Sequence, residues 1–206
     1  MERRDYTGIV PPQYTGKEIE VTALLEKGDS ESAKLFYNIS RDRLLDVNNW
    51  HKLAGMISAK FQLIERTGDP INRKAKTGDY IRVDIPGPGP SAGNGYDWVS
   101  IEEIKDVEEE EIQSTGLRVR PAANPFGNKD ETAHFYSKDA TSNFIVTREG
   151  NIISAWIIDR NIKPNNEPTS TIDKIRDSAI GVTAMGIFSK IQWQGLADGL
   201  VKDDHK

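Results

Sequence analysis

The C-terminal segment from residue 170 to residue 200 constrains the fold more than any other part of the chain. Apolar or small residues recur along it at intervals of three and four, from Ile172 to Trp193. This spacing predicts one continuous helix face over about six turns, or roughly 30 Å, with Ser170 and Asp173 as a capping box. The segment also contains glycines at positions 181, 186, 195 and 199. Because a glycine in a helix interior costs about 1 kcal/mol relative to alanine, we expect this helix to pack closely against another element.

The middle of the chain consists of short runs in which apolar and polar residues alternate, a pattern typical of half-buried strands. In residues 57–64, for example, apolar side chains occupy every odd position from 57 to 63. The runs predicted as strands are 57–64, 79–85, 96–104, 117–120, 134–136, 143–148 and 151–160. Between the last two, Glu149–Gly150 predicts a hairpin turn in which Gly150 adopts a positive φ.

The part of the chain between residue 17 and the first predicted strand has a helical pattern. Glu18–Lys27, Glu31–Ile39 and Arg41–Leu53 are each predicted as a short helix. Ser40 stands at the N-cap position of the third helix, and Gly55 follows its end. We therefore expect the strands to be preceded by short helices.

This order predicts an α+β fold: short N-terminal helices, a curved antiparallel sheet of six or seven strands, and a long C-terminal helix packed on the sheet. In element order, and in the stretch Asp46–Leu53 (DVNNWHKL), the chain from about Ala33 to Leu200 resembles the START and Bet v 1-type helix-grip proteins. The resemblance implies an apolar cavity closed by the terminal helix. Those families commonly begin with a long strand, which the pattern does not show here. An SH3-like small barrel around Gly78–Ile104, with added helices, is the structural alternative.

Composition narrows the function classes. The 206 residues contain no cysteine, which excludes disulfides, thiolate metal sites and cysteine nucleophiles, and we expect neither a metal site nor a cofactor. The net charge of -5 argues against non-specific nucleic-acid binding. With no secretory signal and no apolar stretch long enough to span a bilayer, we expect a cytoplasmic protein. We expect one domain over residues 18–200, an N-terminal arm over 1–17 and a tail over 201–206.

Aromatic and arginine side chains on the predicted sheet and helix form the candidate ligand site. Tryptophans at such positions form either core or the wall of a ligand cavity. Two arginines two apart on one strand share a face; on a concave face they bind a carboxylate or phosphate, and on a convex face they are solvated. The candidate ligand-binding residues are Trp98, Arg118, Arg120, Trp156, Gly186 and Trp193.

Three functions remain open. The first is a non-catalytic protein that binds a small apolar or amphipathic molecule between the sheet and the C-terminal helix. The second is an interaction module, joining copies of this chain or another protein through the loop Pro86–Gly95 and the acidic segment Asp106–Glu111. The third is an enzyme in which His134 acts as acid or base beside Asp159 or a carboxylate of Asp130–Glu131; a structural or solvated histidine is the alternative.

Overall fold

A computed structural model of the chain describes residues 5–55, 59–85, 90–127, 131–165 and 179–203, with the side chains of 179–188 excepted. The strands are β1 (Lys17–Glu26), β2 (Lys60–Ile64), β3 (Tyr80–Asp84), β4 (Asp97–Glu108), β5 (Ile112–Pro121), β6 (Thr141–Glu149) and β7 (Ile152–Ile162). The helices are α1 (Ser30–Leu45), η1 (Val47–Asn49), α2 (Trp50–Ala54), η2 (Ser91–Gly93) and α4 (Ala179–Leu200). The predicted α+β class, with its antiparallel sheet and long C-terminal helix, is confirmed.

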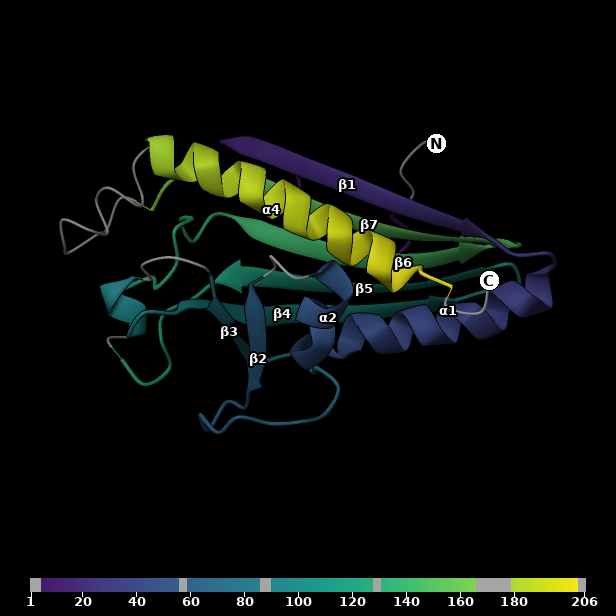
Figure 1. Cartoon of the computed structure of the whole chain (residues 1–206), viewed down its shortest axis with the longest axis horizontal. Helices are drawn as coiled ribbons and strands as arrows, with labels where there is room; N and C mark the ends of the chain where they lie inside the picture. Colours follow the sequence, from purple (N-terminus) through teal and green to yellow (C-terminus); the bar gives the residue numbers. More distant parts are fainter. Residues whose placement is uncertain (1–4, 56–58, 86–89, 128–130, 166–178, 204–206) are drawn as a thin grey trace.

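The strands form one curved antiparallel sheet in the order β1-β7-β6-β5-β4-β3-β2, so the first strand pairs with the last (Figure 1). A single seven-stranded sheet replaces the alternative of a small barrel. The hairpin between β6 and β7 turns at Gly150, whose φ is 58°, as the sequence predicts.

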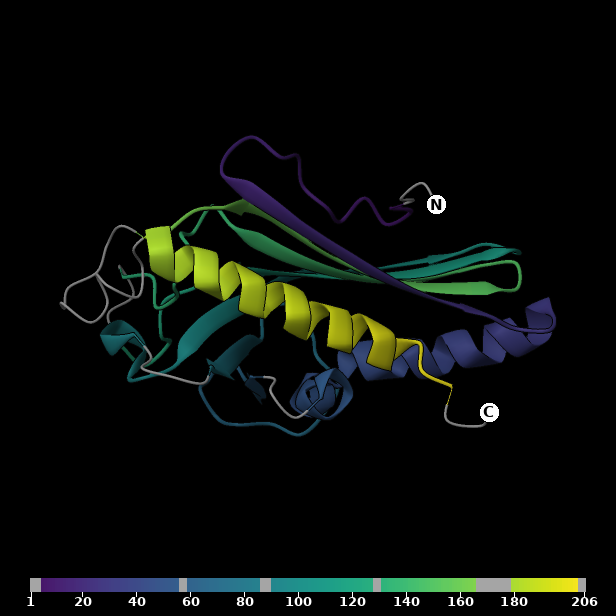
Figure 2. The same cartoon turned by 45° about the horizontal axis from the view of Figure 1, so that its top comes forward.

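The helices lie on the concave side of this sheet. Helix α4 runs along the sheet and contacts β1, β7 and α2, whereas α1 packs on β6 and β7 (Figures 1 and 2). A Cβ atom added at Gly195 would lie 2.5 Å from the Ala54 carbonyl oxygen, and one at Gly199 would lie 2.6 Å from that of Leu53. These two glycines therefore allow α4 to approach the backbone of α2, which confirms the close packing that the sequence predicts.

The N-terminal segment before β1 covers part of the convex side. Ile9 is fully buried there against Ile145, Trp156 and Ile158. Farther along, the Asn161 side-chain oxygen accepts hydrogen bonds from the backbone N–H groups of residues 14 and 15. Each face of the sheet thus has its own apolar cluster, and only the concave face is covered by helices.

The prediction of a helix at Glu18–Lys27 is wrong, because this segment forms strand β1. Its apolar residues Ile19, Val21, Ala23 and Leu25 alternate with polar or exposed ones, and Val21 and Ala23 are buried in the main core. Pairing with β7 satisfies the backbone groups on one side of this edge strand. β1 also supplies the long first strand that the helix-grip resemblance implies.

Smaller differences concern where elements begin and end. The two predicted helices Glu31–Ile39 and Arg41–Leu53 are replaced by α1, which runs through Ser40, and by the separate short helix α2. The segment 134–136 is not a strand; Tyr136 forms only an isolated bridge with Pro164. The proposed capping box at Ser170 and Asp173 and residues 86–89 of the Pro/Gly-rich loop lie outside the described residues.

Candidate functional site

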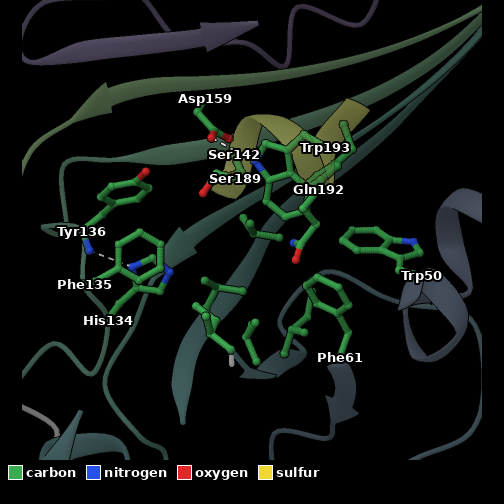
Figure 3. A pocket seen from close by; sticks show the side chains of 16 residues that line it. Trp50, Phe61, His134, Phe135, Tyr136, Ser142, Asp159, Ser189, Gln192 and Trp193 are labelled. Atoms are coloured by element: carbon green, nitrogen blue, oxygen red, sulfur yellow. Dashed lines mark hydrogen bonds between the residues drawn. The ribbon is translucent and has the colours of Figure 1, made fainter. Parts of the chain in front are cut away.

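A cavity of about 60 Å³ lies between α4 and the concave face of the sheet (Figure 3). Strands β2 to β7, helices α2 and α4, and the loop before β6 all contribute to its wall. Its apolar lining consists of Trp50, Phe61, Ile81, Val83, Ile85, Val99, Val119, Phe135, Phe144 and Trp193. Its polar lining consists of His134, Tyr136, Ser142, Asp159, Ser189 and Gln192. The cavity is therefore apolar over most of its wall and polar over a smaller part.

Aromatic rings form a continuous layer along the apolar part. The Trp50 ring lies 4.6 Å from that of Phe144 and 5.4 Å from that of Phe61, measured between centroids. Trp193 of α4 meets Phe144 edge to face at 5.2 Å, which is a favourable geometry for two aromatic rings. These contacts fix the position of Trp193 between the sheet and the cavity.

Asp159 lies at the centre of the polar end of the cavity and is only 2% exposed. It points to the concave face because it shares the parity of Ile153, Ala155 and Ile157 along β7, and it lies opposite Ser142 of β6. The Trp193 indole N–H donates to Asp159 Oδ2 at 3.0 Å, and Oδ1 has no hydrogen-bond partner in the part of the chain that the structure describes. Burial raises the pKa of the Asp159 carboxyl to about 6, although the Ser142 hydroxyl and the Trp193 N–H favour the ionised form.

Tyr136 brings a second buried polar atom to this end of the cavity. The residue is 4% exposed, and its hydroxyl has no hydrogen-bond partner among the described residues. Burial and, less strongly, the negative charge of Asp159 raise the pKa of this hydroxyl above its ordinary value, despite the nearby Ser189 hydroxyl. Figure 3 shows Tyr136 and Asp159 at one end of the cavity and Trp50 and Phe61 at the other.

His134 also lies in the cavity wall and is 8% exposed. Its Nδ1 accepts a hydrogen bond from the Tyr136 backbone N–H at 2.9 Å, and its ring stacks on Phe135 with centroids 4.3 Å apart. Of the carboxylates considered as its partner, Asp159 lines the same cavity and Asp130 lies outside the described residues. The histidine thus holds the loop 134–136 in shape and borders the cavity.

Among the six residues predicted to bind a ligand, Trp193 lines the cavity, whereas Trp98 and Trp156 do not. Trp98 is buried in a separate cluster with Ile64 and Ala133, and its indole N–H donates to the Gly93 carbonyl oxygen at 3.2 Å. Trp156 faces the convex cluster around Ile9. Gly186 belongs to the part of α4 for which only the backbone is described.

Arg118 and Arg120 lie on the convex face, away from the cavity. Their strand neighbours Leu117 and Val119 point into the concave core, so the arginines point the other way. Both bind Glu102, and Arg118 also donates to the Ile9 carbonyl oxygen at 2.9 Å. The two arginines therefore do not bind a ligand anion in the cavity, as the concave alternative supposed. They bind the carboxylate of Glu102 in their own sheet.

The acidic segment Asp106–Glu111 comprises the end of β4 and the turn to β5, and it has partners within the chain. Arg41 Nε lies 3.0 Å from Asp106 Oδ1, and the Thr115 hydroxyl donates to the same oxygen at 2.6 Å. At the other end, the buried Arg148 lies 3.8 Å from Glu111 and donates to the Glu110 carbonyl oxygen. Part of the charge that suggested an interaction surface therefore stabilises the hairpin.

The described residues contain neither a group of metal ligands nor a helix that could span a membrane. They contain no group of three or more histidine, aspartate or glutamate side chains arranged to hold a metal ion. None of the described helices combines the length and the apolar character that crossing a membrane requires.

Comparison with known proteins gives no sequence family: no family model matches the chain, and neither does any curated protein. Solved structures similar to it include a hypothetical protein from Helicobacter pylori, with 12% identity over 89% of this chain and 87% of that one and a TM-score of 0.48. Ginseng major latex-like protein 151 from Panax ginseng has 12% identity over 87% and 99% of the two chains, with a TM-score of 0.36. Truncated norcoclaurine synthase from Thalictrum flavum has 13% identity over 95% and 100%, with a TM-score of 0.35.

Proposed function

We propose that the protein binds a small apolar or amphipathic molecule in the cavity between the sheet and α4. The observation that carries this proposal is the pairing of an aromatic wall with two buried polar atoms, Asp159 Oδ1 and the Tyr136 hydroxyl oxygen, that have no hydrogen-bond partner among the described residues. Protein interiors are closely packed, and their buried polar groups are nearly always hydrogen-bonded. A cavity that keeps unsatisfied polar atoms at one end of an apolar space is a typical ligand site.

The volume limits the size of the ligand. One water needs about 10–15 Å³ on the scale that gives 60 Å³ for this cavity, so it holds about four or five water-sized atoms. Pockets for drug-sized molecules begin at about 300 Å³. The ligand is therefore either a molecule of about five non-hydrogen atoms or a larger one that inserts only its end.

The test is a titration with n-butanol, which matches the cavity in size and carries one polar group. The indole N–H of Trp193, assigned by its loss in Trp193→Phe, reports binding as a chemical-shift change in ¹H–¹⁵N spectra. For a ligand this small we expect a dissociation constant on the order of 1 mM, equivalent to about 4 kcal/mol.

A filled cavity provides the control. Val119 lines the cavity, and Val119→Phe is expected to abolish the shift. Val107 is half-buried in the same sheet outside the cavity, and Val107→Phe should leave the titration unchanged. If the Trp193 signal does not move in the wild-type protein, or moves equally in Val119→Phe, the proposal is wrong.

A second candidate function, acid–base chemistry by His134, is supported by one observation: His134 and Asp159 line the same cavity. An enzyme converts its ligand, whereas a binding protein releases it unchanged. Incubation of the protein with a ligand found by titration, followed by NMR of the ligand, separates the two. A ligand that persists unchanged over many equivalents contradicts the enzymatic function.

A further inference from the structure

We propose that the cavity selects a small organic monoamine in its protonated form, with the ammonium group bound by Asp159 and the apolar body lying among the aromatic rings. This inference rests on the proposed function and specifies its ligand class. It is carried by the position of an acidic side chain in a cavity whose wall is mostly apolar, and by the lack of a cation beside that side chain among the described residues.

Asp159 has no positively charged partner among the described residues, since none of the ion pairs between them includes it. Its neighbour along β7, Arg160, points to the other face and pairs with Glu18. An ionised carboxylate buried without a cation is strongly unfavourable in a protein interior. A cationic ligand would relieve this unfavourable charge, and no other ligand charge would.

The Asp159 carboxylate can also accept a hydrogen bond from a ligand. Oδ2 already accepts from the Trp193 indole, but Oδ1 is free to accept one more hydrogen bond. An ammonium group supplies three donors and forms a charge-assisted bond with a carboxylate. An alcohol could donate a hydrogen bond to Oδ1 but would not neutralise the negative charge of the Asp159 carboxylate. A ligand carboxylate would be repelled by that charge. The Tyr136 hydroxyl oxygen is a further acceptor at the same end of the cavity.

The aromatic wall favours the same ligand. The rings of Phe135, Tyr136 and Trp193 all border the cavity. The face of an aromatic ring carries partial negative charge and attracts an ammonium group when water is excluded. Among the described side chains that line the cavity, His134 alone can become a cation, and its Nδ1 accepts a backbone hydrogen bond, as the neutral ring does.

Size and polarity narrow the class further. Space for about four or five water-sized atoms fits an ammonium group with a chain of three or four carbons, or the amine end of a larger molecule. The far end of the cavity, at Trp50 and Phe61, is apolar. A polyamine would bury a second positive charge where no further carboxylate stands among the described lining residues, and an amino acid would bring a carboxylate near Asp159. Both are therefore excluded as preferred ligands.

The experiment compares three probes of nearly equal size: n-butylamine, n-butanol and sodium butyrate. Each is titrated at pH 7.5 in phosphate buffer, which contains no competing amine, with the Trp193 indole signal as the readout. We expect n-butylamine to bind at least tenfold more tightly than n-butanol, and butyrate to bind weakest. This ranking is measured on the wild-type protein and does not depend on any variant.

Asp159→Asn then tests the residue. It keeps the shape of the side chain and removes its charge, so n-butylamine should bind at least tenfold more weakly while n-butanol is nearly unaffected. Glu109→Gln removes one negative charge from the exposed β4–β5 turn and is the matched control, with unchanged affinities expected.

The outcomes separate the two proposals. If n-butanol binds and n-butylamine binds no better, or if the preference survives in Asp159→Asn, the amine inference is overturned and the proposed function stands. If none of the three probes shifts the Trp193 signal, both are overturned. If butyrate binds most tightly, the amine inference is overturned as well.

Discussion

Each face of the sheet carries a buried or half-buried carboxylate, and the two carboxylates differ in their partners. On the convex face, Glu102 lies between Arg118 and Arg120, which donate to both of its oxygens. On the concave face, Asp159 receives one hydrogen bond from Trp193 and has no cation beside it among the described residues. The convex pair closes a network within the chain, whereas the concave carboxylate leaves an acceptor directed at a cavity.

The difference is visible in the two pKa values. Burial raises the pKa of Glu102, but Arg120 and then Arg118 outweigh burial, so this pKa lies below its ordinary value. For Asp159 burial dominates and raises the pKa to about 6. A carboxylate with a lowered pKa stabilises the fold above its unfolded pKa, and one with a raised pKa destabilises the fold once it ionises. Asp159 therefore works against stability at neutral pH.

Replacing Asp159 should have the largest effect. The folded pKa of about 6 against the ordinary 3.8 corresponds to about 3 kcal/mol of stability lost as the pH rises through this interval. We expect Asp159→Asn to be more stable than the wild type by about 3 kcal/mol at pH 7.5 and about equally stable at pH 3.5, by urea denaturation at both pH values. An Asp159→Asn protein that is less stable at pH 7.5 would show that the carboxylate has a compensating partner.

Lifting α4 from α2 should have the next largest effect, because burial of Asp159 depends on that helix. Gly195→Ala places a methyl group about 2.5 Å from the Ala54 carbonyl oxygen, and overpacking of this kind costs about 1–3 kcal/mol. We expect a lower urea midpoint and, as water reaches Asp159, a pKa closer to its ordinary value, followed by NMR of the carboxyl carbon. Gly28→Ala is the control, since its Cβ meets no atom within 4 Å. Equal effects at both positions would contradict the close approach of α4.

The fold class followed from periodicity, but β1 did not. The alternation of Ile19, Val21, Ala23 and Leu25 was present in the sequence. It was obscured by glutamates, an alanine and adjacent leucines, which favour helices as isolated residues. What decides the outcome is pairing with β7, a strand more than a hundred residues away, and local preference does not report such contacts.

Only part of the site could be predicted from the sequence, for a similar reason. Trp193 lies on a helix whose inner face is readable from its spacing, and it lines the cavity. The parity of Asp159 along β7 is also readable, but its burial depends on which side α4 covers. Tyr136 lies in a loop without any period, held by its bridge to Pro164, so no local signal places its hydroxyl in the cavity. For Arg118 and Arg120, too, the sequence shows that both point to one face of the sheet but not whether this is the concave or the convex face.

The smallest effect, opposite in sign to that of Asp159→Asn, is expected for Glu102→Gln. Removing this carboxylate leaves Arg118 paired with Glu103 and Arg120 bound only to backbone carbonyl oxygens among the described residues, and the network is partly solvated. Ion pairs of this kind contribute up to about 1 kcal/mol, so we expect a loss of about 0.5–1 kcal/mol at pH 7.5. The loss should shrink as the pH falls through the lowered pKa of Glu102, because protonation then removes the same charge in the wild type. Urea denaturation of Glu102→Gln beside Glu109→Gln measures it. If both variants behave alike, or if Glu102→Gln stabilises the protein as Asp159→Asn does, the two faces of the sheet do not differ in the way described.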